Sequence, residues 1–461
     1  MPNLEARSGP RYLAIADALA GDIAQGRLKP GERLPTHRDL GWKLGVTVGT
    51  VSRAYAEAER RGLISGEVGR GTYVRDLGSQ QSHTILTESA AGAETVNLNF
   101  AFPPPDGLEP AIGPTLEALA RDPLLPSLLD YSPHAGLERH RAAGAEWIGR
   151  SGLQVTADRV VVTAGAQNAI LVSLAATTRP GDRVACDQLT YSGMQVVARL
   201  LGLRLEGLPS DDHGMRPDAF EAACRHGDLK AVYLVPTVHN PTTVTMPLQR
   251  RRALAETARA HGVAIIEDDI FALLAQQPVP PPVSSLAPDC SYFLTSLSKT
   301  IAPGLRIGYV AGPPGARDRL AAAVRAASWA ATPLTAEIAT RWIGDGTADR
   351  IMAARKAEAA ARCEIALRIL GRWQPACPPG SIFLWLPLPE PWRASDFALA
   401  AQRRDVAVTP AEACAVGRPD VPAAVRVSLG PPRDRIELER GLRALARLLE
   451  SGRAQALEAI V

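Results

Sequence analysis

The fold is decided by the stretch Ser296-Leu297-Ser298-Lys299-Thr300-Ile301-Ala302-Pro303-Gly304-Leu305-Arg306-Ile307-Gly308. It places two serines, one lysine and one arginine in a short loop after the apolar run 292–295, which is predicted to be a buried strand. Only five of the 51 basic residues are lysines, so a lysine in this loop is more informative than usual. A plain surface lysine is the alternative, but Lys299 lies among apolar and small residues. The stretch predicts a site where an amine and anion-binding groups converge.

Apolar runs alternate with helical stretches along most of the chain. Those expected to be strands are 160–162, 184–186, 231–235, 264–266, 292–295 and 307–310. Buried strands separated by helices indicate an α/β domain with a mainly parallel sheet. From about residue 311 helical patterns dominate, and 383–386 and 425–428 then supply short strands of a smaller closing subdomain.

The Lys299 loop meets part of the requirement for a pyridoxal 5′-phosphate (PLP) site. Such a site needs an amine to form the imine, a carboxylate at the pyridine nitrogen, anion donors for the phosphate and a flat wall for the ring. Lys299 suits the imine. Ser296, Ser298 and Arg306 suit the phosphate.

The other candidates lie where strands end. Asp268 follows the run 264–266 at the carboxyl end of a strand, where ligands bind in open α/β sheets, and would pair with the pyridine nitrogen. For its neighbours Glu267 and Asp269, capping of the next helix stays an alternative. The turn 163–167 lies between a strand and a helix, so its backbone N–H groups can receive phosphate. Tyr191 could stack on the ring and Asn240 could hydrogen-bond its phenolic oxygen.

Together, residues 96–450 resemble the fold-type I aminotransferases of class I/II. The resemblance implies Lys299 as the imine lysine, Asp268 at the pyridine nitrogen, Asn240 at the phenolic oxygen and Tyr191 as the stacking ring. It implies a phosphate site made by Ala166, Gln167, Ser296, Ser298 and Arg306. Tyr131 matches the tyrosine that reaches a neighbouring subunit's phosphate, which implies a homodimer. Arg426 matches the arginine that grips a substrate carboxylate, for which its planar fork is suited.

One position departs from that family. A tyrosine usually follows the aspartate by two or three residues and donates to the phenolic oxygen, but Ile270 and Phe271 stand there. We expect the phenolate to be less stabilised and the pKa of the imine to be raised.

The N-terminal part predicts three helices and a two-stranded wing. The helices are expected at 11–25, from a Thr36 cap to Gly45, and from a Thr47 cap to about Arg61, with the wing at 68–74. In the third helix the inner face holds Val51, Tyr55 and Ala58, and the outer face holds Thr50, Arg53 and Arg60. A helix, a tight turn and a second helix with outward Thr and Arg lets one helix enter the major groove of DNA.

A small basic helical domain with solvated arginines is the alternative for this region. However, its ordered motifs closely resemble the GntR winged helix over residues 11–75: Leu34-Pro35-Thr36-His37-Arg38-Asp39-Leu40, Leu44-Gly45-Val46, Thr50-Val51, Arg53-Ala54-Tyr55, Arg61-Gly62-Leu63-Ile64 and Gly69-Arg70-Gly71-Thr72-Tyr73-Val74. The candidates for DNA contact are Arg38, Thr47, Thr50, Arg53 and, in the wing, Arg70.

The whole chain then reads as a multidomain protein. We expect a winged helix-turn-helix domain (α+β) at 1–75, a polar linker at 76–94 and an α/β aminotransferase-like domain at 95–461, with a large subdomain to about 325 and a small α+β subdomain after it. This combination looks like the MocR subfamily of transcriptional regulators. The resemblance implies a dimeric regulator of a DNA operator that senses an amino compound, or PLP itself, by exchange of the imine at Lys299.

Two alternatives stay open at this point. The chain could be a working aminotransferase that carries an accessory winged helix, or a binding module without a cofactor.

Composition constrains the setting. Residues 1–75 carry 12 Lys and Arg against 8 Asp and Glu, whereas the remainder carries 39 against 40, so the positive excess is N-terminal. The six cysteines show no CxxC spacing, so we expect neither a zinc site nor a disulfide framework. No signal peptide or membrane span is recognised, and a cytoplasmic protein is expected.

Overall fold

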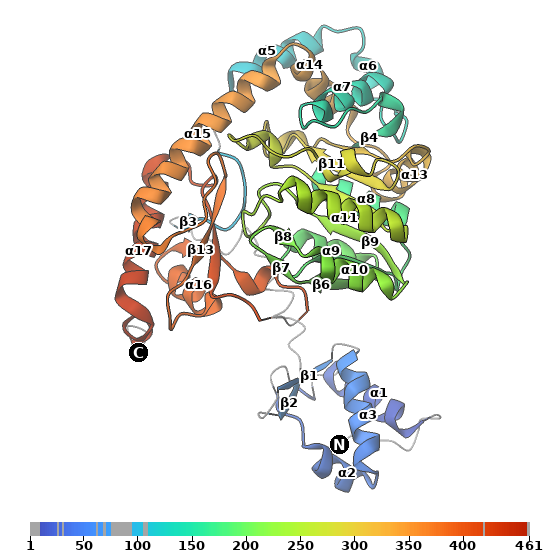
Figure 1. The fold of residues 1–461 in the computed structure, drawn as a ribbon, viewed down its shortest axis with the longest axis vertical. Helices are drawn as coiled ribbons and strands as arrows, with labels where there is room; N and C mark the ends of the chain where they lie inside the picture. The colour runs from blue at the N-terminus through green and yellow to red at the C-terminus, as the bar shows by residue number, and fades with distance from the viewer. Residues whose placement is uncertain are drawn as a thin grey trace. The chain divides into compact units, whose positions relative to one another are not determined.

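The computed structural model describes residues 10–24, 27–29, 32–60, 63–67, 71–74, 95–104, 109–417 and 420–458. The chain forms two compact units, Met1–Ala90 and Ala91–Val461 (Figure 1). The predicted linker 76–94 lies outside the described residues, as does Arg70.

The first unit is a three-helix domain with a two-stranded sheet. Its elements are α1 (Arg11–Ala24), α2 (His37–Leu44), α3 (Val48–Arg60), β1 (Ile64–Glu67) and β2 (Gly71–Val74). β1 and β2 are antiparallel, so the wing begins at Ile64 and not at Val68, because Ile64 pairs with Val74 and is buried in the core. That core is closed by the apolar faces of the three helices, including Ile15, Leu19, Leu40, Val51, Ala54 and Tyr55.

The helix ends of this unit confirm the predicted caps. Thr36 Oγ1 accepts a hydrogen bond from the Asp39 N–H at 3.3 Å, and Thr47 Oγ1 accepts one from the Thr50 N–H at 3.2 Å. Gly45 ends α2 in the left-handed conformation with φ of 62°. A Cβ is unfavourable in that conformation, which explains the glycine.

The second unit contains a seven-stranded sheet in the order β4-β12-β11-β10-β9-β5-β6. The strands are β4 (Val160–Thr163), β5 (Arg183–Asp187), β6 (Arg204–Leu208), β9 (Leu229–Leu234), β10 (Ala264–Asp268), β11 (Ser291–Ser296) and β12 (Gly308–Ala311). Only β12 runs antiparallel to its neighbours within this sheet. This confirms the mainly parallel sheet. β6 and the short hairpin of β7 (Ser210–Asp211) and β8 (Gly214–Met215) were not predicted.

Helices cover both faces of the sheet. Their bounds are α5 (Glu109–Ala120), α6 (Leu125–Leu128), α7 (Glu138–Gly149), α8 (Ala166–Thr177), α9 (Ser192–Leu200), α10 (Pro217–Arg225), α11 (Leu248–His261), α12 (Val283–Leu286), α13 (Arg317–Ser328) and α14 (Pro333–Gly344). Successive strand residues face opposite layers: Tyr233 packs with α8, α9 and α13, and Val232 packs with α10 and α11. The runs of apolar residues in the strands follow from this two-sided burial.

A smaller subdomain has its own core. It comprises α15 (Thr347–Leu370), β13 (Phe383–Pro387), α16 (Ala394–Gln402), β14 (Val406–Ala407), β15 (Thr409–Pro410), β16 (Ala424–Ser428) and α17 (Arg435–Glu458). The long helix α15 reaches from α14 to α17 (Figure 1). β3 (Val96–Asn97) pairs with β14, and Val96 and Leu98 are buried in this core. Residues 96–98, which we expected in the large subdomain, therefore pack in the small one.

We predict that Thr36→Ala lowers the free energy of unfolding of α2 by about 1 kcal/mol, because the Asp39 N–H loses its cap. Hydrogen exchange of the α2 amides in the full chain measures it. Ser52→Ala, at an exposed position inside α3, is the control and should not accelerate exchange. Equal exchange in Thr36→Ala and the wild type would refute a capping role.

Candidate functional site

Lys299 lies in the loop after β11, half-buried. Its Nζ donates a hydrogen bond to the Ala101 carbonyl at 2.7 Å and stands 5.4 Å from the centre of the Phe102 ring. Burial, followed by the nearby charge of Arg426, lowers the pKa of Lys299 from 10.5 to about 8, although Asp268 opposes the shift. A neutral, nucleophilic amine is therefore accessible near physiological pH.

Asp268 ends β10, the parallel neighbour of β11, and is buried. Tyr233 on β9 donates to Asp268 Oδ2 at 2.7 Å, whereas the buried Oδ1 has no hydrogen-bond partner among the described residues. Burial raises the pKa of Asp268 to about 6, and the Tyr233 hydrogen bond and Lys299 limit the rise. A buried carboxylate oxygen without a partner fits a ligand N–H, such as the pyridine nitrogen of PLP.

The start of α8 provides a place for phosphate. Gly165 precedes α8 with φ of 86°, and a Cβ there would lie 2.6 Å from Nη2 of Arg306. Arg306 is exposed, and its Nη2 donates to the Ala164 carbonyl at 3.1 Å. The first N–H groups of a helix, here those of Ala166 and Gln167, have no partner inside it. This end of α8 and the guanidinium therefore suit an anion.

The two serines of the Lys299 loop have different surroundings. Ser296 Oγ accepts from the Ser298 N–H at 3.0 Å and lies 2.9 Å from Ser298 Oγ and 3.1 Å from the Ile307 carbonyl. Ser296 thus braces the loop. Ser296 has one hydroxyl hydrogen for its contacts with Ser298 Oγ and the Ile307 carbonyl. When Ser296 donates to Ser298 Oγ, the hydroxyl hydrogen of Ser298 can point to a phosphate.

Tyr191 stands next to α8. Its hydroxyl donates to Gln167 Oε1 at 3.0 Å, and Gln167 Nε2 donates to the Gly193 carbonyl at 2.9 Å. A Cβ at Gly193 would lie 2.4 Å from the Tyr191 ring, so a glycine is needed for the ring to take this position. Burial raises the pKa of the Tyr191 hydroxyl, and the negative charge of Asp268 raises it further.

Arg426 on β16 joins the subdomains. Nη1 donates to Asn240 Oδ1 at 2.6 Å, and Nη2 donates to the Asn99 carbonyl and to Thr409 Oγ1, the latter at 3.1 Å. Nε is buried without a partner among the described residues. Asn240, predicted at the phenolic oxygen, is thus in contact with the residue predicted to bind the carboxylate.

The two acidic neighbours of Asp268 along the chain have different surroundings. Glu267 accepts from the Val283 N–H at 2.8 Å and the Ser284 N–H at 2.6 Å, so it caps α12. This is the structural alternative left open for that residue. Asp269 is buried, and burial together with the charge of Glu267 raises its pKa.

The positions that depart from the family carry no hydroxyl. Phe271 is buried, and its ring centre lies 5.2 Å from that of Phe383 in an edge-to-face arrangement. The nearest strand tyrosine, Tyr233, donates to Asp268 instead.

Tyr131 is not part of the assembled site within one chain. Its side chain is 84% exposed, and its ring centre lies 5.5 Å from that of Trp329. His134 Nδ1 lies 2.8 Å from the Trp329 carbonyl and fixes this corner. Its contact with a second subunit stays a prediction.

The candidate DNA-reading residues lie on α2 and on α3 with its cap. Arg38, Thr47 and Arg53 are exposed, and Thr50 is half-buried with its Oγ1 2.9 Å from Thr47 Oγ1. Arg70 lies outside the described residues, and so does the side chain of Arg60. The exposed group on α3 is compatible with a recognition surface.

Three residues near the site were not singled out from the sequence: Asn99, Tyr233 and Thr409. Tyr233 is a tyrosine inside the aliphatic run 231–235, and that unusual residue was the available signal. Asn99 and Thr409 reach Arg426 through contacts between distant segments, for which the sequence carries no local sign.

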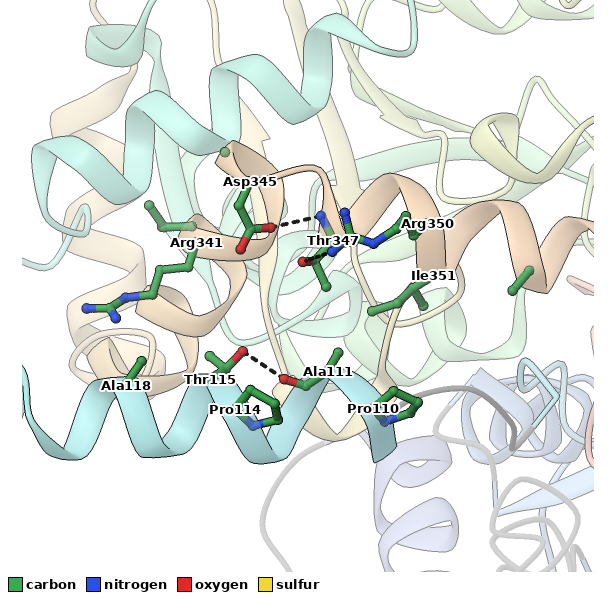
Figure 2. A pocket seen from close by; sticks show the side chains of 13 residues that line it. Pro110, Ala111, Pro114, Thr115, Ala118, Arg341, Asp345, Thr347, Arg350 and Ile351 are labelled. Carbon is green, nitrogen blue, oxygen red and sulfur yellow. Dashed lines mark hydrogen bonds between the residues drawn. The ribbon is translucent and has the colours of Figure 1, made fainter.

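A separate groove of about 750 Å³ lies between α5, α14 and the start of α15 (Figure 2). Its polar groups serve local structure: Asp345 accepts from the Thr347 N–H at 2.8 Å, and Arg350 donates to Thr347 Oγ1 at 2.7 Å. None of the predicted cofactor residues lines it.

Comparison with known proteins identifies the class. Residues 115–445 match the family model for aminotransferase class I and II, and residues 11–74 match that for bacterial regulatory proteins of the gntR family. An archaeal alanine:glyoxylate aminotransferase has the same fold as the second unit, with a TM-score of 0.73 at 23% identity over 86% of this chain and 99% of that one. The chain belongs to the class I and II aminotransferase family and carries a GntR winged helix.

Relatives with both parts narrow this further. The HTH-type transcriptional regulator YdeF of Bacillus subtilis is 32% identical over 97% of this chain and 96% of its own length. The vitamin B6 salvage pathway transcriptional repressor PtsJ of Salmonella typhimurium is 29% identical over 84% of this chain and 87% of its own. The protein is a member of the MocR subfamily of GntR-type regulators, and its cofactor is PLP.

Within the described residues, no helix is long and apolar enough to cross a membrane. No group of three or more His, Cys, Asp or Glu residues in those ranges could hold a metal ion.

The lowered pKa of Lys299 gives a pH-dependent prediction. Because only the neutral amine attacks an aldehyde, the rate at which the cofactor-free protein takes up PLP should rise about tenfold per pH unit at low pH and level off around pH 8. Borohydride trapping at a series of pH values measures the rate. Lys356→Ala should leave the profile unchanged, and a midpoint near 10 would contradict the lowered pKa.

Proposed function

We propose that this MocR-type regulator binds PLP at Lys299 and changes its affinity for a DNA operator when an amino compound takes the place of Lys299. The observation that carries the proposal is that the Lys299 amine lies within electrostatic reach of the buried Asp268, whose Oδ1 has no hydrogen-bond partner among the described residues. In this proposal residues 1–75 read the DNA, 76–94 link and 95–461 sense. The active form is a cytoplasmic homodimer.

When bound, PLP supplies an aldehyde carbon that bonds reversibly to primary amines. The chain's own residues prepare this exchange. Asp268 Oδ1 would accept a hydrogen bond from the ring nitrogen, while Tyr233 holds the other carboxylate oxygen. The N-terminus of α8, with Ser298 and Arg306, would hold the phosphate.

Arg426 defines the class of effector. A buried guanidinium beside Lys299 suits an amine that also carries a carboxylate or a similar anion. The name of PtsJ refers to vitamin B6 salvage. The name of PdxR of Corynebacterium glutamicum, which is 31% identical over 64% of both chains, refers to pyridoxine biosynthesis. These names support PLP itself as the second candidate for the sensed compound.

Displacement of the Lys299 amine needs no further chemistry at the effector. Full transamination would also need Lys299 to move a proton at the α-carbon of the amine. A gel-shift assay with the protein's own upstream DNA, alongside turnover of amino acids with 2-oxoglutarate, separates a regulator from an enzyme. Enzyme-like turnover without a DNA shift would overturn the proposal.

We predict that Lys299→Ala and Arg53→Ala separate the two functions. Lys299→Ala should lose the visible cofactor band and the response to amino compounds, but bind the operator within about twofold of the cofactor-free wild type. Arg53→Ala should weaken operator binding about tenfold, as for loss of a base contact, and keep the band.

Arg11→Ala, an exposed arginine on α1, is the charge-matched control for Arg53→Ala. Fluorescence anisotropy with labelled operator measures all variants. Equal weakening by both arginine variants would mean that α3 does not read bases.

The missing tyrosine gives a spectroscopic prediction. With Ile270 and Phe271 near the ring, the visible band should titrate with a raised pKa, and Ile270→Tyr or Phe271→Tyr should lower this pKa by about one unit. Absorbance measured against pH tests it. An ordinary acidic pKa in the wild type, unchanged in both variants, would show that the hydroxyl does not matter here.

A further inference from the structure

Residues 98–104, which we term the strap, pass over the candidate effector site. Both reactive groups of that site hold its backbone: Arg426 Nη2 donates to the Asn99 carbonyl, and Lys299 Nζ donates to the Ala101 carbonyl at 2.7 Å. Arg355 on α15 holds the Pro104 carbonyl. The strap is thus attached to the groups that an amino compound would engage.

The donors of Arg426 are largely used by the chain. Nη1 serves Asn240, and Nη2 serves Asn99 and Thr409. A two-point grip on a carboxylate takes either Nε with Nη2 or Nη1 with Nη2. Both grips need one of the two Nη2 hydrogens, which serve the Asn99 carbonyl and Thr409 Oγ1. Because Thr409 Oγ1 itself donates to the Asn99 carbonyl at 3.0 Å, a carboxylate bound in this way disturbs the contacts at that carbonyl whichever hydrogen it takes.

The strap also packs tightly against the backbone that follows β16. A Cβ at Gly430, two residues after β16, would lie 1.8 Å from the Phe102 carbonyl oxygen. Because that neighbour is backbone, a side chain at position 430 must displace the strap. Gly430→Ala is therefore a way to move the strap without touching Lys299 or Arg426.

The strap continues directly from β3. The Val96 N–H donates to the Asp405 carbonyl at 2.7 Å, and the Leu98 N–H donates to the Ala407 carbonyl at 2.9 Å. Residues N-terminal to β3 belong to the segment that leads along the chain to the DNA-binding unit. A movement of the strap therefore displaces the C-terminal end of that segment.

We propose that the strap transmits effector binding to the DNA-binding unit, and that the signal is the loss of the Arg426–Asn99 contact to an incoming carboxylate. An amine without a carboxylate displaces Lys299 but leaves Arg426 on the strap. The proposal rests on the function proposed above and specifies its signalling ligands as amines that carry a carboxylate.

Two probes test this in the full-length PLP-bound protein: aminooxyacetate, which carries a carboxylate, and methoxyamine, which does not. With either, the probe nitrogen bonds to the carbon that Lys299 held, the bond to Nζ breaks, and the two hydrogens of the probe nitrogen pass to Nζ. Both probes should change the visible band. Only aminooxyacetate should speed amide exchange at residues 99–102, by about threefold, and shift operator affinity by about fivefold or more.

Gly430→Ala without any probe should reproduce the operator affinity of the aminooxyacetate-treated wild type. Gly371→Ala is the matched control, since a Cβ there meets nothing within 4 Å. It should behave as the wild type. If Gly430→Ala fails to fold, the comparison of the two probes on the wild type decides alone.

Equal effects of the two probes on strap exchange, or faster exchange without a change in operator affinity, would overturn the strap proposal and leave the proposed function standing. A visible band that neither probe changes would overturn the proposed function, and the strap proposal with it.

Discussion

Asp268 ends strand β10 and Lys299 follows the neighbouring parallel strand β11, and burial shifts the pKa of each group toward pH 7. The carboxyl pKa rises from 3.8 to about 6, so the stability that Asp268 contributes is present below pH 3.8 and lost as the pH rises through 6. The amine pKa falls from 10.5 to about 8, so its contribution is present above pH 10.5 and lost as the pH falls through 8. Between pH 6 and 8 both groups are mainly charged while buried. In the proposed function PLP would relieve both costs, because its ring nitrogen would give Asp268 a partner and its aldehyde would give Lys299 a bond.

Arg426 makes the site a junction between the subdomains. The same guanidinium contacts Asn240 from the large subdomain, Thr409 from the small one and the Asn99 carbonyl of the strap. Burial lowers the pKa of Arg426, which reflects the cost of holding this charge away from water. A ligand anion at this point competes with contacts that connect separate parts of the fold. If Arg426 binds the effector as proposed, ligand binding and subdomain contacts share this one side chain, which suits the fold to sensing.

Local features of the sequence predicted local features of the structure. The Thr36 and Thr47 caps and the left-handed Gly45 follow from short-range chemistry, and the buried strands follow from apolar runs of suitable length. Successive side chains of β10 point to opposite faces of the sheet, which explains why Glu267 caps α12 whereas Asp268 lies on the other face. Which of the two faces carries the candidate site depends on the order of the strands, and alternation alone does not predict it. The contact of Arg426 with Asn99 joins residues 327 positions apart, and no periodicity in the sequence encodes it. Asn99 and Thr409, which reach the site only through contacts of this kind, were therefore missed.

The central claim is that exchange at Lys299 and control of DNA binding are one event. The most direct test titrates an amino acid that alters the visible band into the full-length PLP-bound protein with labelled operator, and records absorbance and fluorescence anisotropy on the same samples. The account predicts that the band and the operator affinity change with the same midpoint. A compound that changes operator affinity while the band stays constant would contradict it. So would the finding that none of the amino acids that alter the band changes operator affinity.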